Sequence, residues 1–147
     1  YAPPLEVYSH PNNLFVADFV GNPTMNFIES KAIMNSNNEA NIDFDGVKAK
    51  FVSSHEFTLP HEDVILGIRP EHMDEIPMTQ ADTKINGIVD VVELMGAESY
   101  IHVKREEETV VVRVNGTTDK KMGDAIDVYL NLDQMHIFDI DTEERIL

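Results

Sequence analysis

Short apolar segments, each closed by a turn residue, run along most of this sequence and constrain the fold more than any other feature. Residues 64–69 stop at Pro70, and residues 110–114 stop at the turn pair Asn115-Gly116. No long segment with a helical period lies between them, so parallel βαβ units are disfavoured. The spacing predicts about eight or nine short strands in a mainly β fold, either a sandwich or a small barrel.

A hairpin is predicted early in this strand region. Asp45-Gly46 stands between residues 42–44 and 47–51, and this dipeptide suits a two-residue turn in which both positions need positive φ. The remaining strands are expected at residues 25–33, 64–69, 85–95, 100–104, 110–114, 125–130 and 135–138.

The first part of the chain has a different pattern. Residues 3–20 are predicted to form two short helices, because Pro4 suits a first helical turn and Pro11 separates two apolar segments. Gly21 offers a stop for the second helix. The chain starts at Tyr1 without a secretory signal pattern, and we interpret this start as a cut inside a longer protein.

The charge balance argues against nucleic acid as a partner. Only 11 basic residues stand against 27 acidic ones, for a formal net charge of -16. Nucleic-acid binding depends on Lys and Arg that displace counterions from phosphate. The chain also has no cysteine, so disulfides, thiol catalysis and Cys-ligated zinc are excluded.

Nucleotide-binding and hydrolytic motifs are absent from the sequence. No two of the seven glycines have the spacing of a phosphate-binding loop or of a dinucleotide fingerprint. The His-Glu-x-x-His and Gly-x-Ser-x-Gly patterns are absent too. Carboxylates are so numerous that no pair stands out as a glycosidase acid and nucleophile. We therefore expect no catalytic residue in this chain.

Histidines in a polar segment raise the question of a metal. His55, His61 and Glu62 lie close in sequence, but residues 53–63 have the composition of a solvated loop. Solvated loop histidines are the simpler interpretation, and no metal site is predicted.

Three stretches together resemble the C-terminal part of the ATP-binding subunits of sugar importers of the maltose, multiple-sugar and glycerol-3-phosphate type. Their order and spacing match as well. They are Glu6-Val7-Tyr8-x-x-Pro11-x-Asn13-x-Phe15-Val16-Ala17-x-Phe19-Val20-Gly21 with Pro23-x-Met25-Asn26-Phe27, then Gly67-Ile68-Arg69-Pro70-Glu71-His72, and Val89-x-x-Val92-Glu93-x-x-Gly96-x-Glu98. One departure is local, because Ala2-Pro3-Pro4 stands where the family usually has Gly-x-Pro.

The resemblance implies a domain division and a fold. Residues 1–22 would be the tail of the nucleotide-binding domain and its linker, and residues 23–147 a regulatory TOBE/OB-like β-barrel of the MOP type. It also implies that ATP and Mg²⁺ are bound by an upstream domain, so that this fragment has no cofactor and is not an enzyme. The parent protein would be an ATPase that energises transport.

The same resemblance points to residues for partner or interdomain contact, namely Arg69, Glu71, His72, Glu93 and Gly96. Two interpretations stay open for each group. Arg69 and Glu71 either touch a partner or form an ion pair that fixes local geometry. Glu93 and Gly96 either belong to a contact surface or mark the end of a strand.

The functions compatible with these features fall into separate classes. The favoured one is a regulatory, dimer-contact domain of a carbohydrate importer, in the cytoplasm at the inner face of the membrane. Its partners would be a second ATP-binding subunit, the transporter's membrane subunits and a phosphotransferase-system regulator, without nucleic acid. The alternative is a sensor for small oxyanions, which needs convergent N–H groups or cations. A carbohydrate hydrolase is a third class, for which no catalytic pair stands out. Nucleic-acid binding through an OB-like barrel is a fourth class, which the charge balance opposes.

Overall fold

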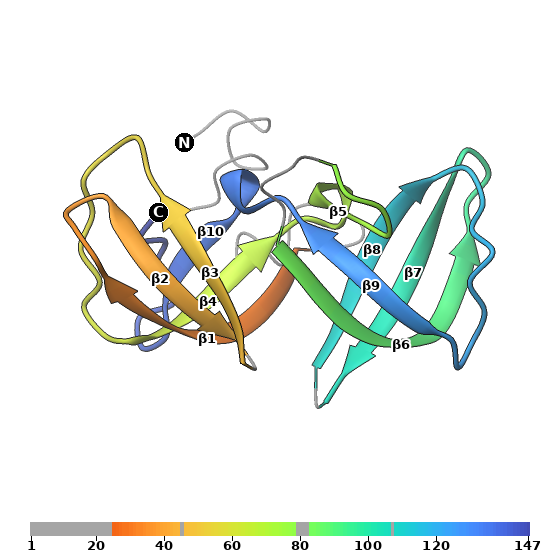
Figure 1. Cartoon of the computed structure of the whole chain (residues 1–147), viewed down its shortest axis with the longest axis horizontal. Helices are drawn as coiled ribbons and strands as arrows, with labels where there is room; N and C mark the ends of the chain where they lie inside the picture. Colours follow the sequence, from red (N-terminus) through yellow and green to blue (C-terminus); the bar gives the residue numbers. More distant parts are fainter. Residues whose placement is uncertain (1–24, 45, 79–82, 107) are drawn as a thin grey trace. The chain divides into compact units, whose positions relative to one another are not determined.

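The computed structural model describes residues 25–44, 46–78, 83–106 and 108–147. They form a mainly β structure, as predicted, with strands β1 to β10 and two short 3-10 helices (Figure 1). The helices expected over residues 3–20 and the boundary expected near residue 22 lie outside the described residues. Among the described residues, no helix is long and apolar enough to cross a membrane.

The chain divides into two compact units, each with a five-stranded sheet. Among the described residues, unit 1 comprises those within 25–67 and 135–147, and unit 2 comprises those within 68–134. Unit 2 is therefore inserted into unit 1 along the sequence.

Unit 1 contains a sheet with the order β10-β4-β1-β2-β3. Its strands are β1 (Asn26–Met34), β2 (Glu39–Phe44), β3 (Val47–Val52), β4 (Asp63–Ile68) and β10 (His136–Asp139). The predicted hairpin is confirmed, since β2 and β3 pair antiparallel with Phe44 opposite Val47. The Gly46 N–H donates to the Asp43 carboxylate at 3.1 Å in this turn.

The core of unit 1 follows from the alternation of its strands. Along β1, Ile28 and Ala32 are buried while Glu29 and Lys31 are exposed, as expected for a sheet with one covered face. Phe27 and Phe138 meet edge to face with ring centroids 6.1 Å apart. The other buried apolar side chains include Ala40, Ile42, Phe44, Phe51, Phe57, Val64, Leu66 and Ile137.

Unit 2 contains a sheet with the order β5-β9-β6-β7-β8. The strands are β5 (Met73–Asp74), β6 (Thr83–Leu94), β7 (Glu98–Arg105), β8 (Glu108–Asn115) and β9 (Ala125–Leu130). The helix η1 (Pro70–His72) precedes β5, and η2 (Leu132–Gln134) follows β9. Both η1 and β5 contact β8 at the opposite edge of the sheet, so the sheet nearly closes into a barrel, as the OB-like prediction requires.

Apolar side chains from alternate positions fill this barrel. Val110, Val112 and Val114 on β8 point inward, and the residues between them are more exposed. A bulge in β6, between Val89 and Val91, shifts the register toward β7. The inward set also includes Met73, Ile85, Val89, Ile101, Val103, Ile126, Val128 and Leu130.

Candidate interaction surface

The outer face of β6, β7 and β8 carries polar side chains in register. Glu93 on β6 pairs with Tyr100 on β7, and Tyr100 pairs with Arg113 on β8. Residues that pair across a sheet place their side chains on the same face. Here that face points away from the buried Ile101 and Val112. We call it the outer face, and it comprises Ile88, Val91, Glu93, Glu98, Tyr100, His102 and Arg113.

Hydrogen bonds and ion pairs link most of these groups. The Tyr100 hydroxyl donates to Glu98 Oε1 at 3.0 Å, and Arg113 Nε lies 2.5 Å from Glu98 Oε2. His102 Nε2 lies 2.5 Å from Glu93 Oε1. Both carboxylates are therefore held in defined positions on the surface, and the charge of Glu98 is partly balanced by Arg113.

Glu71 belongs to the same electrostatic environment. Burial is the main reason that the pKa of the Tyr100 hydroxyl is raised above its usual value. The hydrogen bond to Glu98, the Glu98 charge and the Glu71 charge also raise this pKa, while Arg113 lowers it. The helix η1, which carries Glu71, lies against β8. Glu71 and Glu98, which belong to two of the sequence motifs, thus act on the same hydroxyl within unit 2.

Arg69 and His72 lie deeper than the outer face. Arg69 is 3% exposed, which leaves little of its surface for a partner. His72 is half-buried, and burial is the main cause of a pKa below the usual 6.5. The Arg69 charge lowers the His72 pKa further, and the Glu71 charge opposes both effects. A contact role for Arg69 and His72 stays a prediction.

Gly96 forms the turn between β6 and β7. Its φ is +85°, a conformation that glycine adopts without the steric cost of a side chain. The Met95 N–H closes this turn by donating to the Glu98 carbonyl at 2.9 Å. Gly96 therefore does mark a strand end, and a role in partner contact stays a prediction.

Exposed apolar side chains continue the outer face along β6. Ile88 is 49% exposed and Val91 is 43% exposed. At the turn, Met95 is 54% exposed, and Leu94 is 68% exposed although it pairs with the buried Ser99 and so belongs to the opposite side of the sheet. Apolar groups beside fixed charges are typical of protein contact surfaces.

Tyr100, Arg113, Ile88 and Val91 were not singled out by the sequence motifs. The alternation of β7 and β8 is the signal for Tyr100 and Arg113, whereas along β6 alternation alone would place Val91 on the side of the buried Val89. Sequence alone does not give the cross-strand register that aligns Glu93, Tyr100 and Arg113, because the bulge in β6 shifts it.

Two family models match this chain. The model of the MalK OB fold domain matches residues 21–73, and the model of the TOBE domain matches residues 66–138. The chain belongs to the MalK OB-fold and TOBE domain family. The sequence resemblance to sugar-importer subunits is thereby confirmed.

Relatives of this family align over nearly the whole chain. The maltose/maltodextrin import ATP-binding protein MalK of Mannheimia succiniciproducens is 34% identical over 92% of this chain and 37% of its own length. The sn-glycerol-3-phosphate import ATP-binding protein UgpC of Escherichia coli O157:H7 is 31% identical over 97% of this chain and 39% of its own length. The oligosaccharides import ATP-binding protein MsmX of Bacillus subtilis is 30% identical over 97% of this chain and 40% of its own length. The TOBE-family chain thus spans about two fifths of these relatives' length.

A solved structure shares the fold. The cytoplasmic molybdate-binding protein ModG, crystallised with molybdate bound, superposes with a TM-score of 0.58 over 76% of this chain and 94% of its own. The sequence identity is 11%, so the likeness concerns the fold alone.

Proposed function

We propose that this chain is the regulatory and dimer-contact part of the ATP-binding subunit of a carbohydrate ABC importer, where it modulates ATP-driven sugar uptake. The observation that carries the proposal is the match of both domain models together with relatives that align over more than nine tenths of the chain. These relatives are import ATP-binding proteins for maltodextrins, glycerol 3-phosphate and oligosaccharides.

The outer face of unit 2 supports a contact role. Glu93 and Glu98 are held by His102, Tyr100 and Arg113, so their charges are pre-positioned. Preorganised charges favour one partner over others by electrostatic complementarity. Beside them, the exposed Ile88 and Val91 supply apolar surface for burial.

The mechanism in this proposal is conformational. A second ATP-binding subunit or a phosphotransferase-system regulator would hold the regulatory domain in one arrangement. Such a partner shifts the nucleotide-binding domains only to the extent that it binds their open and closed states with different affinity. The chain's contribution is therefore a coupling free energy rather than a chemical step.

ATP chemistry falls outside this chain in the proposal. The glycines of the sequence have no phosphate-loop spacing. We assign ATP and Mg²⁺ to the part of the subunit that corresponds to the unaligned three fifths of the relatives. The assembled subunit would act at the cytoplasmic face of the membrane, against the transporter's membrane subunits.

The proposal is tested with the ATP-binding subunit that carries this chain, assembled with its membrane subunits in proteoliposomes. The test variant is Val91→Asp, which puts a charge on the exposed apolar part of the outer face. The control is Val52→Asp, because Val52 is 57% exposed on β3 of unit 1. We expect Val91→Asp to uncouple sugar uptake or its inhibition from ATP hydrolysis, while Val52→Asp leaves both unchanged. Equal behaviour of the two variants in uptake and regulation would contradict the assignment of the contact to this face.

Calorimetry separates this function from the oxyanion sensor. The regulatory proposal expects no binding heat when molybdate, sulfate or phosphate is added to the chain. A saturable signal from one of these anions at micromolar concentration favours the sensor instead.

A further inference from the structure

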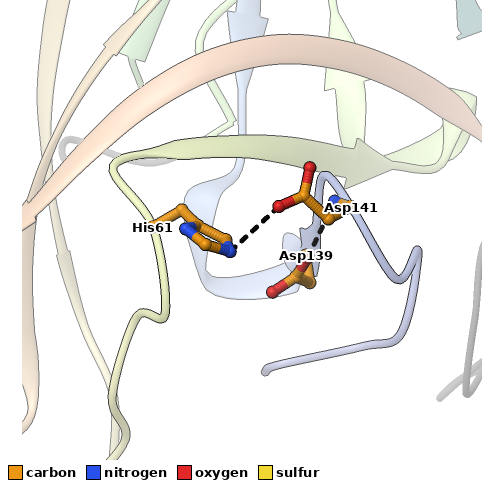
Figure 2. Close-up of side chains that lie close together, drawn as sticks. All are labelled: His61, Asp139 and Asp141. Carbon is orange, nitrogen blue, oxygen red and sulfur yellow. Dashed lines mark hydrogen bonds and ion pairs between the residues drawn. The ribbon is translucent and has the colours of Figure 1, made fainter.

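Three side chains of types that can ligate a metal ion lie close together in unit 1, namely those of His61, Asp139 and Asp141 (Figure 2). We propose that they form a binding site for a divalent first-row transition-metal ion of the Zn²⁺ class. This inference does not rest on the proposed function, because the site lies in unit 1 and the outer face lies in unit 2.

The register of the sheet brings these residues together. Asp139 ends β10 and pairs with Val64 near the start of β4, and His61 lies just before β4. Asp141 follows β10 in the next turn. The ligand atoms of the three side chains all lie within 4.8 Å of one another. His61 Nε2 is 3.0 Å from Asp141 Oδ2.

The carboxylate of Asp139 is the fixed element of the group. Asp139 is 7% exposed, and the backbone N–H groups of Thr142 and Asp141 donate hydrogen bonds to its carboxylate. These bonds measure 3.0 and 2.8 Å, and both go to Oδ1. Neither of these backbone bonds uses Oδ2, which is the oxygen that this carboxylate offers to a further ligand.

The local charge is not balanced by a permanent cation. In the part of the chain that the structure describes, the ion-pair partner of Asp141 is His61, and no Lys or Arg pairs with Asp139 or Asp141. The imidazole carries a positive charge only when protonated. A divalent ion would supply that charge permanently while the neutral imidazole served as a ligand.

The donor set selects the class of ion. One imidazole nitrogen with two carboxylate oxygens suits Zn²⁺, Ni²⁺ or Co²⁺, whereas Ca²⁺ and Mg²⁺ prefer oxygen ligands alone. Tetrahedral ligand bonds to zinc of about 2.0–2.2 Å place neighbouring ligand atoms about 3.3–3.6 Å apart. His61 Nε2 and Asp141 Oδ2, at 3.0 Å, lie a few tenths of an ångström below this range. Their side chains are 52% and 68% exposed, so small rotations suffice to bring this distance and the two distances to Asp139 into range.

A bound ion would join the segment before β4 to the turn after β10. The polar composition of residues 53–63 favoured a solvated loop for His61. The two acidic neighbours that the structure gives this histidine lie far along the chain. His55 and Glu62 are close to His61 in sequence, but the residues that share this group with His61 in the structure are Asp139 and Asp141.

The experiment is a titration of the untagged, EDTA-treated chain with ZnCl₂ by calorimetry, repeated with CoCl₂ by visible absorption. The variants are His61→Ala and Asp141→Asn. The control is His55→Ala, an exposed histidine in the same polar segment. Melting curves of the metal-free proteins check folding, and we expect all four to coincide because the altered side chains are exposed.

We expect the wild-type chain and His55→Ala to bind one equivalent of Zn²⁺ with micromolar affinity. His61→Ala and Asp141→Asn should each bind at least about tenfold more weakly, with loss of the Co²⁺ absorption bands. Millimolar Mg²⁺ should not displace the zinc. Absence of saturable binding by the wild type, or equal affinity of His61→Ala and His55→Ala, overturns the proposal and leaves the cluster an ordinary ion pair.

Discussion

Tyr100 donates its hydroxyl proton to the carboxylate of Glu98 across 3.0 Å, two residues away on the same face of β7. The other oxygen of this carboxylate holds Arg113 of the neighbouring strand. One residue of the third sequence motif thus fixes two outer-face side chains that belong to no motif.

Glu98→Gln should lower the pKa of the Tyr100 hydroxyl, since the Glu98 hydrogen bond and charge both raise it. The pKa should remain above its usual value of 10.0, because burial is the largest cause of the shift. An NMR titration of the tyrosine ring carbons measures it. Glu29→Gln, on β1 of unit 1, is the matched control and should leave this pKa where it is. An unchanged value in Glu98→Gln would show that Glu98 does not set the electrostatics of this face.

Glu93→Lys should weaken partner binding by roughly tenfold or more and leave folding intact. Glu93 is exposed, so its reversal changes the surface potential without burying a charge. Glu29→Lys makes the same change of charge on unit 1 and serves as the control. Affinity for the second subunit or the regulator, measured at two salt concentrations, checks the result. If both variants bind the partner as tightly as the wild type does, Glu93 has no contact role and only marks the end of its strand.

Arg69→Glu should destabilise unit 2 by about 3 kcal/mol or more, because it puts an acidic side chain at a position that is 3% exposed. This outcome would separate a structural role from a contact role, and Arg69→Met, which keeps much of the volume without a charge, should cost less. Urea unfolding of both variants gives the comparison. A stable Arg69→Glu chain with altered partner affinity would restore Arg69 to the contact surface.

Gly87→Ala should cost unit 2 about 1–3 kcal/mol through overpacking. A Cβ at Gly87 would lie 2.5 Å from Val103 Cγ1 and 2.6 Å from the Lys104 carbonyl oxygen, and the latter is backbone that cannot rotate away. Asn86→Ala, at the adjacent exposed position, should have a small effect on the urea midpoint. Similar midpoints for the two variants would mean that β6 and β7 separate easily.

Lowering the pH should destabilise the chain through His72. Its pKa in the folded state is below the 6.5 of the unfolded chain, so the unfolded state binds the proton first. The stability from neutral His72 is present above pH 6.5 and is lost as the pH falls through the folded-state pKa. Unfolding free energies from pH 8 to 5 should therefore fall more steeply for the wild type than for His72→Gln. If the unfolding free energies of the wild type and His72→Gln depend on pH in the same way, His72 is not the source of the pH dependence.

The strands were predictable because their signals are local. Alternation, Pro70 and the Asn115-Gly116 pair fix where strands begin and end, and the structure has β4 and β8 there. The division into two sheets was not predictable in this way. It depends on β10 pairing with β4 rather than with its neighbour in sequence, and no local pattern specifies that pairing.

The candidate surface was predictable only in part. Glu71 and Glu93 came from motifs, but the alignment of Glu93, Tyr100 and Arg113 depends on strand register, which is a long-range property. Arg69 carries a charge, and a charged residue is ordinarily expected at the surface, whereas the fold buries it. The acidic neighbours of His61 could not be predicted from the sequence, because they reach this histidine only through the pairing of β10 with β4.

The insertion of unit 2 between β4 and β10 sets an order of events on the ribosome. Gly67 and His136 face each other in the sheet of unit 1, yet residues 68–134 separate them in sequence. At about 5–20 residues per second, β10 leaves the ribosome roughly 3–14 seconds after β4. During that interval the sheet of unit 2 has time to form. The edge of β4 that will pair with β10 stays unpaired and open to other chains. A translational pause within unit 2 would lengthen that exposure, so codon usage across residues 68–134 bears on how much of the protein reaches the native state.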